Sequence, residues 1–352
     1  MADLTLEDIA KQTGVSRSTV SRVVNNHPNV RDDVRKRVLE VIQITGYQPN
    51  AAARTLASQR SWTLGFVLPL SVSFFFTDPF FSHLTKGIIQ ACNQHNYTLA
   101  LFLADTKEDE KQIIARISRK GLLDGVLVQA GHHGDQQIVG ALIDADMPQV
   151  IIGRPFRSDN VNYVDTDNFS GSHNAVTHLI QLGHKRIGTV TGPLESTVGL
   201  DRKAGYIKAL SECGYKVEDA LIVEGDFTET GGYSAMKNML PAKPDAVFVA
   251  SDTMTIGAIR AAREAELNVP DDIAFVSFDD EAIAKISDVQ LTTIRQPVEQ
   301  LGITALELLI DVIKNGTNPP RHIIMDTELV IRDSCGAKQF SPQLTFSENK
   351  LT

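Results

Sequence analysis

Four polar side chains near the N-terminus share one face of a helix predicted over residues 16–24: Arg17, Ser18, Ser21 and Arg22. They are spaced at i, i+1, i+4 and i+5, and this face holds no apolar residue. The other face is formed by Val20, Val23 and Val24. A guanidinium group can pair with guanine, and a serine hydroxyl can bond base edges or phosphates. The pattern therefore favours a helix that enters the major groove of DNA.

Two further helices are predicted around this one. Thr5 and Asp8 form the capping box of a first helix, and Gly14 lies in the turn that follows it. Ser16 then caps the second helix. A third helix repeats apolar residues every three or four positions and ends near Gly46. Together these elements predict a small three-helix domain of the helix-turn-helix type.

An ordinary helical hairpin with a solvated face is the alternative for this segment. The charge distribution weighs against it, because residues 1–60 hold nine Lys and Arg against six Asp and Glu, a net charge of +3. The whole chain carries −9, so the remaining residues are strongly acidic. A polyanion would attract the basic residues 1–60 and repel the acidic remainder of the chain. The charge distribution therefore favours contact between a polyanion and the N-terminal domain alone.

The segment from Pro49 to Ser58 is the second informative stretch. Asn50 is a good helix cap, but a helix of about eight residues is shorter than the roughly 12–15 that an isolated helix needs in water. Leu56, with Arg54 nearby, would suit a wedge that inserts between base pairs and folds only on the duplex. A plain helical linker is the alternative.

These two stretches resemble the LacI/GalR family of transcriptional regulators. The resemblance implies that Arg17 and Ser18 read bases and that Asn29 makes a further groove contact. It assigns phosphates and nearby bases to Thr19, Ser21, Arg22 and Asn25. It places on the hinge helix Asn50, Ala53, Leu56 and Ala57, with Leu56 as the intercalating side chain. Three residues complete the candidate DNA-binding set: Thr5, Ser16 and Arg54.

Eight short apolar runs follow between residues 62 and 280 and alternate with helical stretches: WTLGFVLPL, YTLALFLA, DGVLVQ, PQVIIG, KRIGTVTG, ALIVEG, DAVFVAS and IAFVSFD. Continuous apolar strands separated by helices predict parallel sheets covered on both faces. Eight such strands exceed one usual domain. The predicted fold class is therefore α/β, with the three-helix head followed by two doubly wound parallel-sheet lobes of the kind found in periplasmic binding proteins.

Ligand sites in open α/β sheets lie beyond the carboxyl ends of the strands, so we expect a site between the lobes. Polar or aromatic side chains stand just past six strand ends: Asp78, Phe80, Phe81, Arg154, Arg202, Phe227, Asp252 and Asp279. Carboxylates, guanidiniums and aromatic rings together suit neutral, hydroxyl-rich ligands such as sugars. Each residue alone could instead be a charged helix cap, but six strand ends agree.

The family resemblance implies that Arg202, Phe227 and Asp279 belong to an effector pocket and that the loop 78–81 closes over the ligand. The DPFF loop and the GRP after the fourth strand are similar to sugar-responsive members, and residues 196–198 lack the basic contacts of the purine-responsive type. The predicted function is a repressor that a sugar or glycoside releases from a pseudo-palindromic operator. The alternative is a regulator strengthened on DNA by a purine or a partner protein.

The predicted boundaries divide the chain into a head, 1–48; a hinge helix with linker, 49–61; lobe one, 62–163 with 293–322; lobe two, 164–292 with 323–334; and a polar tail, 335–352. Three crossings between the lobes would form a hinge that can close on a ligand. The stretch RHIIMDTELVIR is predicted as one last strand. The tail shows no leucine heptads, so we expect a homodimer rather than a heptad-linked tetramer.

Other functional classes find no support in the sequence. The three cysteines are scattered without a CxxC pair, and His132-His133 is expected to lie on a loop surface, so we expect no metal site. Phosphate-binding and nucleophile-elbow motifs are absent, which argues against an enzyme, and we expect no cofactor. The first residues contain no apolar stretch of the kind found in signal peptides, and the sequence holds no run of 18 apolar residues. We therefore expect no membrane partner and a cytoplasmic location rather than a periplasmic receptor.

Overall fold

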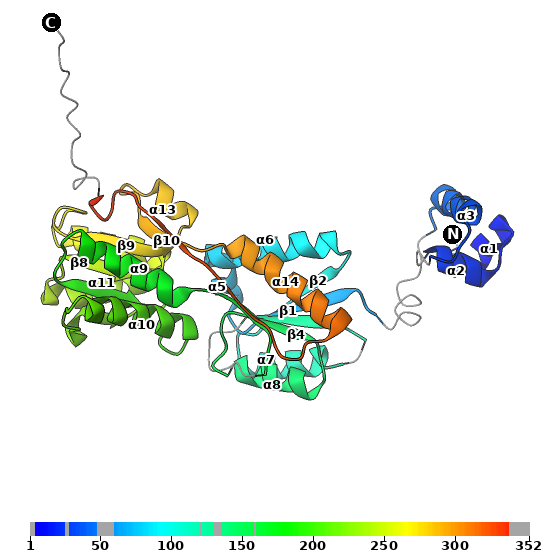
Figure 1. Ribbon diagram of the computed structural model, residues 1–352, viewed down its shortest axis with the longest axis horizontal. Helices are drawn as coiled ribbons and strands as arrows, with labels where there is room; N and C mark the ends of the chain where they lie inside the picture. The colour runs from blue at the N-terminus through cyan, green and yellow to red at the C-terminus, as the bar shows by residue number, and fades with distance from the viewer. Residues whose placement is uncertain are drawn as a thin grey trace, which may run out of the picture. The chain divides into compact units, whose positions relative to one another are not determined.

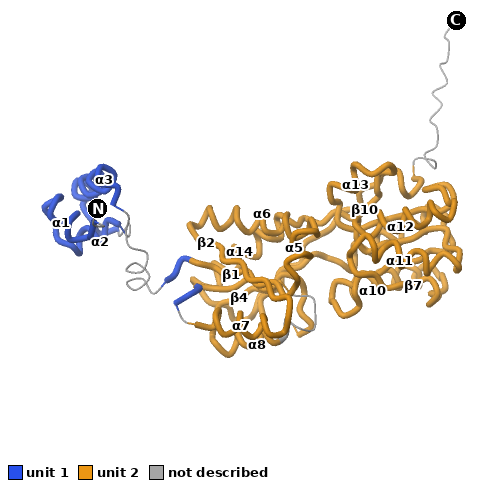
Figure 2. The backbone as a smooth tube through the Cα atoms, turned by 180° about the vertical axis from the view of Figure 1, so that it is seen from behind, with its two compact units in different colours: residues 1–62, 120–123 blue, residues 63–119, 124–352 orange. Residues whose placement is uncertain are grey.

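The computed structural model describes residues 4–24, 28–47, 60–119, 121–129, 135–157 and 160–337 of the 352-residue chain. The chain divides into two compact units, residues 1–62 with 120–123 and residues 63–119 with 124–352 (Figure 2). Several predicted DNA contacts lie outside the described residues: Asn25, Asn50, Ala53, Arg54, Leu56 and Ala57. Among the described helices, none has the length and apolar character needed to span a membrane.

The first unit contains the three predicted helices, α1 (Leu6–Thr13), α2 (Arg17–Val24) and α3 (Asp32–Thr45) (Figure 1). The capping box at the start of α1 is confirmed: Thr5 N donates to Asp8 Oδ2 over 2.9 Å, and Asp8 N donates to Thr5 Oγ1 over 3.3 Å. Gly14 ends α1 with a φ of 67°, which glycine adopts without strain. The helices share one core, formed by Ile9, Ala10, Val20, Val23, Val38 and Tyr47.

Lobe one of the second unit is a six-stranded sheet in the order β11-β5-β4-β3-β1-β2, with all neighbouring strands parallel. Its strands are β1 (Thr63–Leu68), β2 (Thr98–Leu103), β3 (Gly125–Gln129), β4 (Gln149–Ile152), β5 (Tyr163–Thr166) and β11 (His322–Met325). Its helices are α5 (Val72–Thr77), α6 (Pro79–Gln94), α7 (Lys107–Ile117), α8 (Asp135–Asp144) and α14 (Val298–Asn315). Figure 1 shows α6 and α14 packed together over one face of this sheet.

Lobe two has the order β12-β10-β9-β8-β6-β7, and only the edge strand β12 runs antiparallel. Its strands are β6 (Ile187–Thr191), β7 (Ile222–Glu224), β8 (Ala246–Val249), β9 (Ala274–Asp279), β10 (Thr292–Arg295) and β12 (Glu328–Val330). Its helices are α9 (Asn168–Gln181), α10 (Thr197–Glu212), α11 (Glu229–Met239), α12 (Asp252–Glu264) and α13 (Ala282–Ile286), with 3-10 turns η1 (Asp219–Leu221) and η2 (Leu240–Ala242).

Both faces of the lobe two sheet are buried, as the continuous apolar runs predicted. Alternate residues of β8 and β9 point to opposite sides: Phe248 and Val276 pack with α9 and α10, whereas Val247 and Phe275 pack with α11 and α12. The predicted fold class is confirmed, and all eight predicted runs form strands. The structure adds β5 and β10, which are short and contain polar residues.

The last predicted strand is corrected, because RHIIMDTELVIR forms two strands in different lobes. β11 joins the sheet of lobe one and β12 joins that of lobe two, with the chain crossing between them. The other crossings follow β5 and β10 rather than residues 163 and 292. Each predicted boundary between the two lobes therefore comes a few residues too early, because a short strand completes its sheet before the chain crosses.

Candidate functional site

A cavity lies between the two lobes at the carboxyl ends of their strands. The empty space within it is about 950 Å³, part of it open to solvent. Six of the eight predicted ligand residues line it: Asp78, Phe80, Phe81, Arg202, Phe227 and Asp279. The strand-end pattern in the sequence thus indicated where the cavity lies.

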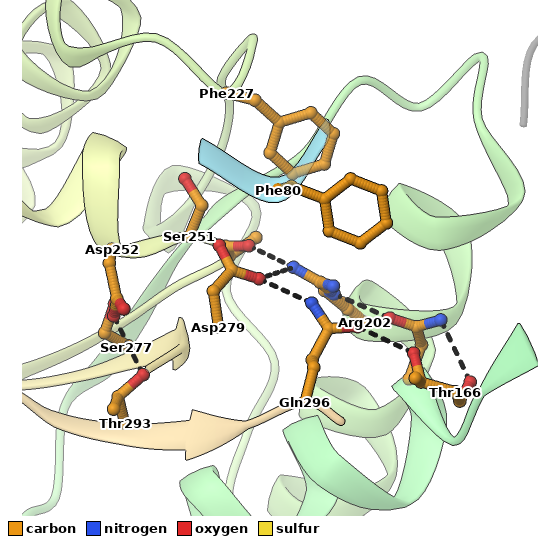
Figure 3. Close-up of polar contacts among 12 residues, drawn as sticks. Phe80, Thr166, Arg202, Phe227, Ser251, Asp252, Ser277, Asp279, Thr293 and Gln296 are labelled. Atoms are coloured by element: carbon orange, nitrogen blue, oxygen red, sulfur yellow. Dashed lines mark hydrogen bonds and ion pairs between the residues drawn. The ribbon is translucent and has the colours of Figure 1, made fainter. Parts of the chain in front are cut away.

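Arg202 is a buried guanidinium at the wall of this cavity, supplied by α10 (Figure 3). Its Nε donates to Asn168 Oδ1 over 2.9 Å, and its Nη1 donates to the carbonyl of Ala250. Its Cζ lies 3.6 Å from the ring centroid of Phe278, a cation–π contact. Burial lowers the pKa of Arg202, and the nearby Asp279 opposes this shift. The guanidinium is therefore held in one orientation by groups of lobe two, which come from α9, β9 and the segment after β8.

Asp279, the last residue of β9, has a φ of 118°, which for a residue other than glycine costs about 1–3 kcal/mol. Its Oδ1 accepts from Gln296 Nε2 over 2.7 Å and lies 3.5 Å from Arg202 Nη1. Gln296 Oε1 in turn accepts from Thr166 Oγ1 over 2.7 Å (Figure 3). Burial raises the pKa of Asp279, and Arg202 lowers it. The side chain of this strained residue is thus hydrogen-bonded to Gln296, and through Gln296 to Thr166. These two residues lie at two of the crossings between the lobes.

Aromatic rings enter the cavity from both lobes, Phe80 from α6 and Phe227 from the segment after β7 (Figure 3). Phe81 packs edge-on against Phe80, with ring centroids 5.3 Å apart. Asp78 caps α6 by accepting from Phe80 N over 3.0 Å, and burial raises the pKa of Asp78. Rings beside carboxylates offer an apolar face and hydrogen-bond acceptors to the same ligand.

Several polar lining residues were missed by the sequence analysis: Gln129, Asp165, Thr166, Asn168, Ser251, Thr253 and Gln296. Asp165 accepts from the backbone N–H groups of Thr166 over 2.8 Å and Arg154 over 3.1 Å. Burial nevertheless raises the pKa of Asp165 to about 6. The available signal was the polar run DTDN, which ends the short strand β5 and begins α9.

The prediction that Arg154 contacts the ligand is corrected, because this residue does not line the cavity. Its Nε and Nη2 donate to Asp201 Oδ2 and Oδ1 over 3.1 and 2.6 Å. Its carbonyl accepts from Thr197 Oγ1 over 2.6 Å. Arg154 follows β4 of lobe one, whereas Thr197 and Asp201 belong to α10 of lobe two. Arg154 therefore joins the two lobes.

Asp252 is likewise absent from the cavity lining and fully buried. Its Oδ2 accepts from Glu281 N over 2.7 Å, and its Oδ1 accepts from Thr293 Oγ1 over 2.8 Å. Burial raises the pKa of Asp252 to about 6. This carboxylate holds the loop after β9 against β10, which corrects its predicted contact with a ligand.

We expect Arg154→Met to weaken the affinity of the cavity for its ligand by up to about fivefold, because a partly exposed ion pair between the lobes contributes at most about 1 kcal/mol. Asp201→Asn should have the same effect, and the double variant should lose no more than either single variant. Isothermal titration calorimetry would measure this. Independent, additive losses would show that the two side chains act separately.

The predicted DNA-reading face of α2 is turned away from the core of the head. Its polar residues are exposed or half-buried: Arg17, Ser18, Thr19, Ser21 and Arg22, with Asn29 exposed before α3. Ser16 caps α2 as predicted, because its Oγ accepts from Thr19 N over 3.1 Å. Arg17 Nε lies 2.9 Å from Glu7 Oε1 on α1. The face can therefore meet another molecule without disturbing the apolar core.

Comparison with protein families gives two matches along the chain. Residues 5–50 match the family of bacterial regulatory proteins of the lacI type, and residues 176–335 match the periplasmic binding protein-like domain. Among curated proteins, the HTH-type transcriptional regulator CelR of Thermobifida fusca is 35% identical over 334 residues, which cover 94% of this chain and 98% of CelR. The transcriptional repressor PurR of Edwardsiella ictaluri is 34% identical over 334 residues, 94% of this chain and 96% of PurR.

Solved structures extend the likeness to the whole architecture. The transcriptional regulator CelR-cellobiose complex has a TM-score of 0.75 at 32% identity and covers 94% of this chain and 99% of the CelR chain. The lac repressor dimer bound to operator and the anti-inducer ONPF has a TM-score of 0.81 at 26% identity, covering 95% of this chain and 99% of the repressor chain. These likenesses span the three-helix head and both lobes.

Proposed function

Because the chain belongs to the lacI family of bacterial regulatory proteins, it is a DNA-binding transcriptional regulator, and we propose that a sugar or glycoside bound between its lobes releases it from a pseudo-palindromic operator. The observation that carries the effector proposal is the interlobe cavity, where Arg202 and Asp279 face aromatic rings from both lobes. Charged and amide groups bond sugar hydroxyls, and rings stack on the apolar faces of the sugar.

We assign DNA contact to the predicted set of residues: Thr5, Ser16, Arg17, Ser18, Thr19, Ser21, Arg22, Asn25, Asn29, Asn50, Ala53, Arg54, Leu56 and Ala57. The polar, exposed face of α2 and the net charge of +3 over residues 1–60 support this assignment. The side chains of Arg17 and Ser18 would read base edges, and the remaining contacts would fix the register of the helix in the groove.

Cellobiose is the first candidate for the effector. CelR, which resembles this chain over almost its whole length, has been solved in complex with cellobiose. We assign ligand contact to Asp78, Phe80, Phe81, Arg202, Phe227 and Asp279. We add Gln296, whose amide bonds Asp279 within the lining, and Asp165, whose carboxyl group lines the same cavity. Arg154 and Asp252 are left out because neither lines the cavity.

The regulator would act as a homodimer in the cytoplasm and would need no cofactor. A dimer related by a two-fold axis matches a pseudo-palindromic operator, and the likeness to the lac repressor dimer supports it. The sugar would favour one arrangement of the lobes and operator DNA another. A coupling of about 1–3 kcal/mol would change operator affinity about 5–150-fold, and the operator must weaken sugar binding by the same factor.

Fluorescence anisotropy on a palindromic duplex with a central CG step tests the proposal. The duplex complex should dissociate when cellobiose or another sugar is added, and it should resist moderate salt. A complex that no sugar disturbs but that a purine or a partner protein strengthens would instead establish the corepressor alternative.

We predict that Leu56→Ala weakens operator binding by about tenfold, because an intercalating side chain supports the kink in the duplex. Binding to random duplex DNA should change little, since it depends on phosphate contacts. Anisotropy titrations on both duplexes would compare the two losses. An equal loss on both would remove the wedge role from Leu56.

A further inference from the structure

The first residue of α2, Arg17, is paired across the helix-turn-helix with Glu7 in the first turn of α1. Arg17 Nε lies 2.9 Å from Glu7 Oε1, and the two side chains are 68% and 53% exposed. An ion pair this exposed contributes little to the stability of a domain. Neither residue belongs to the core of the head, which is formed by apolar side chains. The contribution of the pair to holding the helices together is therefore small.

The geometry of the pair determines which edge of the guanidinium is available to DNA. The closest approach of Glu7 to the Arg17 guanidinium is at Nε rather than at the Nη1 and Nη2 atoms of its end. Guanine presents two acceptors in the major groove, O6 and N7, which match two parallel N–H donors of arginine. Holding one side of the fork also reduces the conformational freedom that Arg17 loses on binding.

We propose that Glu7 is a positioning residue that orients Arg17 for end-on contact with a guanine and so sets the base preference at one position of each operator half-site. This inference rests on the proposed base-reading role of Arg17. Glu7 need not touch DNA for this role. The negative charge of the Glu7 carboxylate also repels the phosphate backbone. This repulsion lowers the affinity for sequences that lack the guanine.

Glu7→Gln is therefore expected to move two measurements in opposite directions. Preference for the guanine should fall about 2–5-fold, as expected for the loss of an exposed ion pair that holds the Arg17 fork. Affinity for random duplex DNA should rise about 2–5-fold, because one negative charge near the phosphates is removed. A purely structural role for Glu7 would lower both affinities together.

The test uses the full chain and an operator selected by the unaltered protein from a random duplex library. Competition binding then measures the preference at each base pair for the unaltered protein, Glu7→Gln, Glu7→Asp and Arg17→Ala. Arg17→Ala should abolish the preference at one base pair per half-site, and Glu7→Gln should reduce it at that same base pair. Glu7→Asp keeps the charge but shortens the reach, so it should lower the preference without raising random-sequence affinity. Thermal unfolding of each variant should match that of the unaltered protein.

Glu40→Gln is the matched control, since it removes the same charge from an exposed position on α3. It should leave every base preference unchanged. If Arg17→Ala abolishes a preference that Glu7→Gln leaves intact or shifts to another base pair, the positioning role of Glu7 is overturned while the base-reading role of Arg17 stands. If Arg17→Ala alters no preference, the base-reading assignment fails and the inference fails with it.

Discussion

Replacing Asp279 with asparagine should abolish the response to sugar while leaving operator binding intact. Asp279 lines the cavity, and one of its oxygens is held by Gln296 Nε2. A hydrogen bond to a charged group contributes about 1.5–3 kcal/mol, so its loss should lower sugar affinity about 10–150-fold. The carboxylate also lies 3.5 Å from Arg202 Nη1, and without its charge the buried guanidinium loses a neighbour of opposite sign.

Calorimetry with cellobiose measures the loss of binding, and anisotropy on the operator measures the retained DNA affinity. Asp288→Asn is the control, because its side chain is 83% exposed and pairs with Arg263 away from the cavity lining. This control should respond to sugar normally. A variant at Asp279 that still dissociates from the operator on sugar addition would remove this residue from the site.

The head and the eight main strands were predictable because their signals are local. A capping box such as Thr5 with Asp8 needs only four residues, and a buried parallel strand is an unbroken apolar run. The polar face of α2 is local too, since helical spacing alone separates Arg17 and Arg22 from the valine face. These features do not depend on how distant segments of the chain pack against them.

The errors have a different origin, which is pairing between distant segments. Arg154 and Asp252 stand past strand ends like the residues that line the cavity, but they pair with distant partners such as Asp201 and Thr293 instead. Gln296 was missed because it follows the short strand β10 at a crossing between lobes. Such partners depend on the tertiary fold, which periodicity and composition do not specify.

The cavity also predicts a dependence of stability on pH. Burial raises the pKa of Asp165 from its ordinary value of 3.8 to about 6, and it raises the pKa values of Asp78 and Asp279. A carboxyl group with a raised pKa binds its proton more tightly in the folded state than in the unfolded state. Stability is then greater below the ordinary pKa and is lost as pH rises through the raised pKa. The sugar-free lobes should therefore melt at a higher temperature at pH 5.5 than at pH 7.5.

Sugar binding should show the opposite dependence on pH. A sugar hydroxyl that donates to a carboxylate favours the charged form, so binding should release protons and lower the pKa of the group. If only the ionised form binds, a group with a pKa of about 6 is about nine-tenths protonated at pH 5, and affinity there should be about tenfold weaker than at pH 7.5. Contributions from Asp279 and Asp78 would enlarge this difference.

Calorimetry at several pH values, in buffers that differ in ionisation enthalpy, measures both the affinity and the number of protons released. Asp165→Asn should flatten the dependence between pH 5 and 7, because the titrating group is removed while an amide oxygen remains to accept from Thr166 N. Asp245→Asn is a comparison at a carboxylate outside the cavity lining, and it should keep the full dependence. Equal affinity at pH 5 and 7.5, with no proton release, would mean that the cavity carboxyl groups do not change ionisation on binding, and the hydroxyl groups of the sugar would then be held by Arg202 and the amides alone.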